Sequence, residues 1–151
     1  MPHPLSTSGP QAASRRSAAV VLLIYLWTLP TTSLGLIFIP LAVVGGGMQV
    51  VAGVLELYGG GVHGFLRYCT LLPGGASAMT LGHVVLGRDR AALDASRVHE
   101  RVHVRQCERW GPFFLPAYLM ASIIAWFRGR DPYRGNAFEM EAYENEESPV
   151  E

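Results

Sequence analysis

The chain has 151 residues, half of them hydrophobic, and its 12 basic and 12 acidic residues cancel to a net charge of zero. This length allows one domain with an appendage but not two full cores. The high hydrophobicity and low charge exclude a disordered chain, and the lack of a basic excess argues against a nucleic-acid partner. Cys69 and Cys107 are too few for a disulfide framework or an all-cysteine zinc site.

The N-terminal part predicts a disordered tail over 1–16 and a membrane anchor over 17–45. No charged residue or histidine occurs from residue 17 to residue 55, and the apolar run is longer than the roughly 20 residues that a membrane helix needs. Two forms are open: a single tilted transmembrane helix kinked at Pro30, and a re-entrant helical hairpin that turns at 30–33. The arginines flank the run on both sides, so they leave its orientation in the membrane open.

Short β-like runs follow the apolar segment, and glycine clusters separate them. The runs cover 49–58, 65–72 and 76–86. Glycine-rich turns between such runs are typical of neighbouring strands that pair antiparallel. We therefore expect a small antiparallel sheet, followed by three helices, in an α+β fold.

The last third of the chain predicts those three helices. Asp89 can cap a helix over 90–110, which contains neither Gly nor Pro before a Gly-Pro pair ends it. The apolar run 113–127 is short for a membrane span and predicts a buried or membrane-surface helix. Asn136 can cap a last helix that extends to about residue 146.

The first of these helices contains the sequence HERVH, which has the metal-binding form H-E-x-x-H. Residues four apart lie on one face of a helix, so His99 and His103 can both reach one ion. Glu100 is offset by about 100° around the helix, where its carboxylate can reach a water bound to the metal. The alternative is a surface helix in which Glu100 pairs with Arg97 or Arg101.

The same helix face continues through Gln106 and Trp110 without an aliphatic residue at its centre. A plain amphipathic helix would carry aliphatic residues there, so the polar stripe favours a metal partner. A catalytic zinc takes three protein ligands, and the third should come from a distant part of the chain. The candidates for it are His83, Cys69, Glu139, Glu141 and Glu144.

The segments HERVHVRQ and DPYRGNAFEMEAY, with the region of Tyr118 between them, resemble the gluzincin zinc peptidases. Within that family the likeness is to the small minigluzincin-type members and to uncharacterised bacterial membrane proteins, and it covers 76–143. The resemblance implies a minimal zincin-like zinc domain over 46–151. It also implies that Glu139 is the third Zn²⁺ ligand and that Glu100 is the catalytic base.

The resemblance implies further roles around the zinc. It places an edge strand at 80–87 beside the cleft, so His83 would contact substrate, support a ligand or serve only the fold. Gln106 is expected to orient a zinc-binding histidine through its second ring nitrogen. The group that stabilises the oxyanion stays open among Tyr118, Tyr133 and Tyr143.

The function implied by the resemblance is that of a membrane-anchored zinc-dependent peptidase, in which Glu100 takes a proton from a zinc-activated water. The implied partners are membrane lipid and a peptide or protein substrate. The implied location is the bacterial cytoplasmic membrane, with the side of the zinc domain and the oligomeric state left open. Two alternatives remain: a non-catalytic membrane-anchored zinc-binding or scaffold module, and a small membrane protein without metal.

Overall fold

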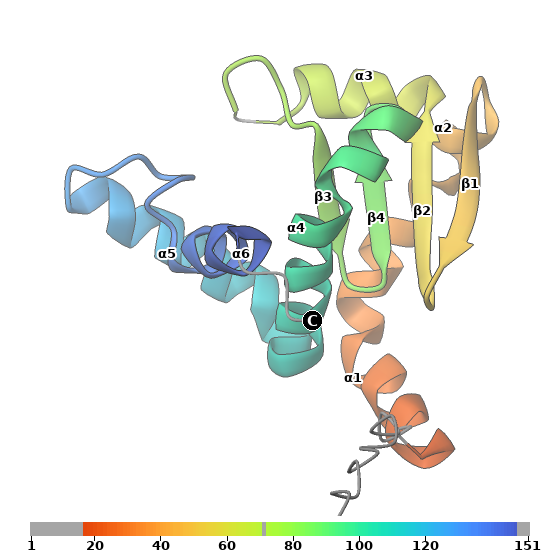
Figure 1. Ribbon diagram of the computed structural model, residues 1–151, viewed down its shortest axis with the longest axis horizontal. Coiled ribbons are helices and arrows are strands. Elements are labelled where there is room, and N and C mark those ends of the chain that lie inside the picture. The colour runs from red at the N-terminus through yellow and green to blue at the C-terminus, as the bar shows by residue number, and fades with distance from the viewer. Residues whose placement is uncertain (1–16, 71, 148–151) are drawn as a thin grey trace, which may run out of the picture.

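One small sheet with helices on both faces organises the chain, as the computed structural model shows for residues 17–70 and 72–147 (Figure 1). The predicted tail at 1–16 lies outside these described residues. The elements in chain order are α1 (Ala18–Leu36), α2 (Ile39–Val43), β1 (Gly46–Val51), β2 (Val54–Gly59), α3 (Gly60–Tyr68), β3 (Ala78–Leu81), β4 (Val84–Gly87), α4 (Arg90–Trp110), the short 3₁₀ helix η1 (Gly111–Phe113), α5 (Phe114–Phe127) and α6 (Ala137–Glu147). The α+β class expected from the sequence is confirmed.

The sheet has the order β1-β2-β4-β3 and is mixed. β1 pairs antiparallel with β2, and β3 pairs antiparallel with β4, but β2 and β4 run parallel, with Leu55 opposite Val84. The expected antiparallel pairing thus holds for β1 with β2 and for β3 with β4, but not for β2 with β4 at the centre of the sheet. Parallel neighbours need a crossover connection, and α3 provides it by leading the chain from the end of β2 back across the sheet.

Two of the predicted strand runs have a different structure. Most of the run 65–72 belongs to α3 or follows it, because Val62 and Leu66, four residues apart, are both fully buried on one helix face. The run 76–86 is a hairpin, because Gly82 adopts a positive φ of 65° between β3 and β4. A side chain at Gly82 would also collide with the backbone of Thr32.

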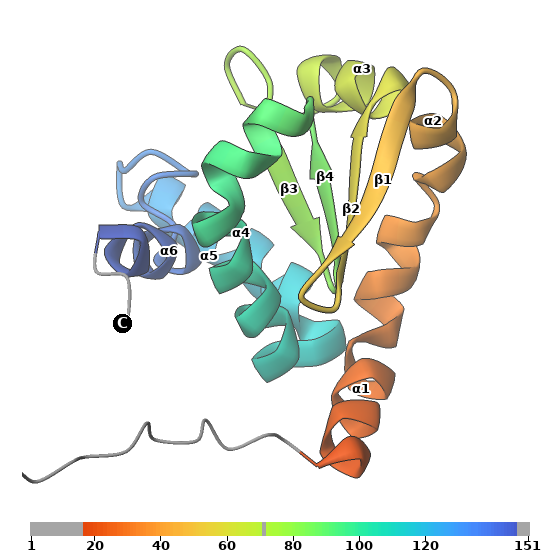
Figure 2. The same ribbon diagram turned by 45° about the vertical axis from the view of Figure 1, so that its right-hand side comes forward.

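The core lies on both faces of the sheet. Leu57, Val84 and Leu86 face α2 and α3, where they form the larger apolar cluster with buried residues of those helices. Val85, between two residues of that cluster, points to the other face and packs with Leu93 of α4. Figure 2 shows the result, with α3 and α4 on different sides of the strands.

α1 is one continuous helix that passes through Pro30 and ends at Leu36. The alternative of a helical hairpin turning at 30–33 is therefore wrong. One polar face of α1 packs on the rest of the protein: the Thr28 hydroxyl lies 3.0 Å from Nδ1 of His83, and the Thr32 hydroxyl accepts the His83 backbone N–H at 3.1 Å. The remaining faces are apolar and mostly exposed.

Two helical stretches among the described residues are long and apolar enough to cross a membrane, judged by length and composition. One is α1, as the sequence predicted, and the other is the stretch Arg90–Phe127, which joins α4, η1 and α5. Because α4 carries charged residues throughout its length, the apolar part of the second stretch is η1 and α5.

The bounds of α4 match the predicted helix, and the Asp89 carboxylate caps it by accepting the N–H of Ala92 at 2.8 Å. Asn136 caps α6 by accepting the N–H of Phe138 at 2.9 Å. For α5, the prediction of a buried helix is wrong, because Phe114 and Ala125 are its only buried residues. Its exposed apolar side leaves the membrane-surface form of that prediction standing.

Candidate metal centre

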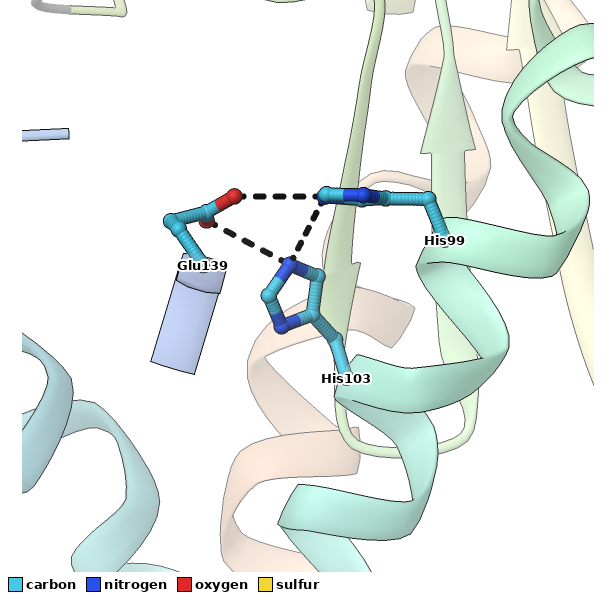
Figure 3. A group of neighbouring side chains, drawn as sticks. All are labelled: His99, His103 and Glu139. Carbon is cyan, nitrogen blue, oxygen red and sulfur yellow. Dashed lines mark hydrogen bonds and ion pairs between the residues drawn. The ribbon is translucent and has the colours of Figure 1, made fainter. Parts of the chain in front are cut away.

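His99 and His103 project from one face of α4 toward Glu139 on α6, as Figure 3 shows. The Nε2 atoms of the two histidines are 3.2 Å apart. Nε2 of His99 lies 3.2 Å from Oε2 of Glu139, and Nε2 of His103 lies 3.3 Å from Oε1. All three side chains are buried, so a helix pair brings together three donor groups that are separated by up to 40 residues.

These separations match the requirements of a metal ion. Two ligand atoms that bind zinc tetrahedrally at 2.0–2.1 Å are about 3.3 Å apart, which is close to each of the three distances. Two imidazoles and a carboxylate also form a donor set that suits zinc. Within the described part of the chain, this is the only cluster of His, Cys, Asp and Glu that could hold a metal ion. Cys69 and Glu144, two other candidate ligands, are exposed and outside it.

A buried network fixes the orientation of His103. Its Nδ1 atom lies 2.8 Å from Oε1 of Gln106, which is fully buried. In the neutral imidazole, donation from Nδ1 to that oxygen leaves Nε2 without a proton, as metal binding requires. The Gln106 amide in turn donates to the Phe138 carbonyl and to Oε2 of Glu141, each at 3.0 Å, and Arg109 donates to the other Glu141 oxygen. Glu141 thus faces Gln106 and not the metal site.

Glu139 is held from α5 as well. The Tyr118 hydroxyl donates to Oε1 of Glu139 at 2.6 Å. Burial opposes ionisation of Glu139, but the interactions with His103, His99 and Tyr118 outweigh it and lower its pKa to about 2. The carboxylate is therefore ionised and available as a ligand at neutral pH.

Aromatic and acidic groups surround His99. The ring of Tyr143 lies 4.8 Å from the His99 ring, and Nδ1 of His99 lies 3.5 Å from Oε2 of Glu146. Tyr133 lies in the same region, where burial, the charge of Glu139 and a hydrogen bond with Tyr143 raise the pKa of its hydroxyl. All three candidate oxyanion tyrosines thus gather around Glu139 and His99.

Glu100 lies beside the ligand cluster and is buried against the edge strand β3. The Thr80 hydroxyl of β3 donates to Oε2 of Glu100 at 2.7 Å. Burial raises the pKa of Glu100 more than His103, Thr80 and His99 lower it. A carboxylate with a raised pKa is a stronger proton acceptor, which is the property that a general base needs.

His83 is not part of this centre. It lies in the turn between β3 and β4, where its ring nitrogens contact Thr28 of α1 and Oε1 of Glu108, the latter at 3.3 Å. The edge strand beside α4 is β3, which ends at Leu81, so the prediction of one cleft-lining edge strand over 80–87 is wrong. β4, which holds the second half of that segment, lies inside the sheet.

Three residues that contact the site were not predicted, namely Thr80, Arg109 and Glu146. Glu141 was predicted only as a candidate ligand, whereas it accepts hydrogen bonds from Gln106 and Arg109. Arg109 follows Gln106 by one helical turn, and Glu141 follows Glu139 by two residues, so both spacings were visible in the sequence. Their mutual contact depends on how α4 packs against α6, which no local pattern specifies.

No protein family, curated protein or solved structure matches this chain.

Proposed function

We propose that this protein is a membrane-anchored zinc-dependent peptidase of the gluzincin type. The observation that supports it most directly is the convergence of His99, His103 and Glu139 at tetrahedral spacing, with Glu100 buried next to them. Zinc, when bound, would polarise a peptide carbonyl and acidify a water molecule. The proposed anchor is α1, which has the length and composition of a membrane span.

The residues of the chain take distinct parts in the proposed hydrolysis. Glu100 accepts a proton from the attacking water and passes it to the amine that leaves. Thr80 holds the Glu100 carboxylate by its hydrogen bond, so that one oxygen keeps a fixed direction. Among the described strands, β3 has only β4 as a neighbour, and its outer edge can pair with an extended peptide.

The test uses the full chain purified in detergent, with zinc content and hydrolysis of a peptide library as the two measurements. We expect about one zinc per chain in the wild-type protein. Glu100→Gln should keep the zinc and lose about 10²- to 10⁴-fold in kcat/KM, because it removes the general base alone. An amide at this position still accepts the Thr80 hydrogen bond, so the fold should persist.

Glu144→Gln is the matched control, because it neutralises an exposed acid of α6 outside the ligand cluster. It should leave both zinc content and hydrolysis at wild-type levels. Equal hydrolysis in Glu100→Gln and wild type would contradict the mechanism. Zinc without hydrolysis of any peptide would instead favour a non-catalytic zinc-binding module, and absence of zinc would favour a membrane protein without metal.

A further inference from the structure

The surface of α5 that points away from the metal centre is apolar and exposed. Its six large residues range from 42% exposed for Ile124 to 77% for Phe127. The six are Leu119, Met120, Ile123, Ile124, Trp126 and Phe127. Their spacing places them on one side of the helix, whereas Phe114 and Tyr118 on the other side pack around His103. No element of the described chain covers the six residues.

Cationic residues follow this apolar face directly. Arg128, Arg130 and Arg134 are all exposed in the loop between α5 and α6. The only acid in this loop, Asp131, uses its Oδ1 atom to accept the N–H groups of Tyr133 and Arg134. Among the described residues, no carboxylate lies within 4.0 Å of the three guanidinium groups, so they are available to an external anion.

A cavity of about 210 Å³ lies where the apolar face meets this loop. Ala121, Ile124 and Ala125 of α5 form its apolar wall, and Arg128 and Arg130 line it from the loop. This combination fits a lipid, because the arginines can bind a phosphate group while the acyl chain follows the helix. Trp126 lies close in the chain to the apolar residues of α5 and to Arg128. Tryptophan favours this kind of position, between apolar and charged residues, at membrane interfaces.

We propose that α5 and the loop after it bind the surface of a bilayer through anionic phospholipids. Although the joined stretch Arg90–Phe127 has the length of a membrane span, its α4 part is charged, and the 14 residues of α5 are only about 21 Å long, which is too short to cross a hydrocarbon core of about 30 Å. Its other side is occupied by the metal centre, so the helix lies along the interface. α1 and α5 approach each other at η1, where the rings of Trp27 and Phe113 are 6.3 Å apart, and the membrane helix and the surface helix are thus adjacent.

The first experiment measures where α5 lies in lipid nanodiscs that contain the full chain. Cys69→Ser removes the exposed thiol, and Cys107 is buried, so a spin label attaches only at an introduced cysteine. At Ile123→Cys, we expect collisions with oxygen to exceed collisions with a water-soluble nickel chelate. Ala91→Cys, an exposed position at the other end of α4, is the control and should show the reverse. Equal nickel access at both positions, or spin–spin broadening from a second copy at residue 123, would overturn the proposal.

The second experiment tests the lipid headgroup with fluorescent phosphatidylglycerol and phosphatidylcholine in detergent micelles. The wild-type chain should bind phosphatidylglycerol more tightly, and Arg128→Gln combined with Arg130→Gln should weaken that binding about 30-fold. Arg90→Gln removes an exposed arginine elsewhere and should change nothing. Equal binding of the two lipids by the wild type, or wild-type binding by the double variant, would overturn the role of the arginines. Neither measurement depends on zinc or on peptidase activity.

Discussion

Buried histidine side chains lie at two opposite faces of α4. On one face, the Nε2 atoms of His99 and His103 converge on each other and on Glu139. On the other face, His83 packs against α4 through Glu108, and its two ring nitrogens contact Thr28 and Glu108. Both environments combine imidazole with carboxylate and hydroxyl groups.

The difference between the two faces lies in what the ring nitrogens contact. His103 has Gln106 at one nitrogen, while the other nitrogen points to a position shared by two further donors. Both nitrogens of His83 contact groups of different elements, and its backbone N–H is also bonded to α1. A metal ligand is therefore recognised by convergence of donor atoms, whereas a structural histidine has a separate partner for each nitrogen.

Replacement of one histidine on each face should give the largest contrast. His103→Ala removes one of the three proposed zinc ligands and should abolish stable zinc binding and hydrolysis. His83→Ala should keep one zinc per chain but lower stability by about 1–3 kcal/mol, because the buried Thr28 hydroxyl and the partly buried Glu108 carboxylate lose their contacts with the ring. Metal analysis and thermal unfolding in detergent measure the two effects. Loss of zinc in His83→Ala with a normal unfolding temperature would contradict the comparison.

Gln106 should show an intermediate effect, because it would act on the proposed zinc only through its contact with His103. Gln106→Leu has a similar size but offers no acceptor to Nδ1, so we expect zinc affinity to fall about 10- to 100-fold. Competition with a chromogenic chelator measures the affinity. Gln106→Glu alone would set a second carboxylate against Glu141, so the rescue variant combines Gln106→Glu with Glu141→Gln, whose amide can donate to the new carboxylate. This double variant restores the acceptor for Nδ1 and should recover most of the zinc affinity. A Leu variant that unfolds more easily but binds zinc as tightly as wild type would show that Gln106 serves packing alone.

Glu56 of β2 tests a buried charge on the His83 side of the protein and should affect stability without affecting zinc. Burial raises its pKa, but hydrogen bonds from Arg97 and Gln49 outweigh burial, so the net shift is below the ordinary value of 4.5. The folded state thus gains stability from Glu56 above pH 4.5 and loses it as the pH falls through the lower folded pKa.

Glu56→Gln should lower stability at neutral pH by about 1–3 kcal/mol, because the ion pair with Arg97 is lost. The difference from wild type should narrow as the pH falls below 4.5. Asp94→Asn is the control, since Asp94 pairs with the same arginine but is more than half exposed, and it should cost less than about 1 kcal/mol. Thermal unfolding across a pH series measures the stability of both variants. A difference in stability between Glu56→Gln and wild type that stays constant at all pH values would contradict the lowered pKa of Glu56.

The cluster of possible ligands was predictable because its signals are local. His99 and His103 are one helical turn apart, and both helices that carry the cluster have recognisable caps in Asp89 and Asn136. Glu139 was identified from a family resemblance, and the structure places its carboxylate within reach of both histidines.

The sheet was less predictable because its order depends on contacts between distant residues. The parallel pairing of β2 with β4 requires α3 to cross the sheet, yet the segment of α3 contains aromatic and apolar residues that suit a strand as well as a helix. The position of His83 also depends on contacts between distant residues. Once Gly82 turns the chain, His83 points to α1 instead of the cleft, and only the packed fold reveals which of these neighbours it has.

The contacts of Thr28 and Thr32 with His83 pack α1 directly on the sheet that lies beside the His99, His103 and Glu139 cluster. A helix linked by a flexible chain could change its angle in a bilayer without moving the domain that follows. Here, two contacts with the turn at His83 hold α1 against the sheet. The tilt of a membrane helix depends on the thickness of the surrounding hydrocarbon layer. Where α1 spans a bilayer, a thinner or thicker membrane would therefore rotate the cluster of His99, His103 and Glu139 through the same angle as the helix.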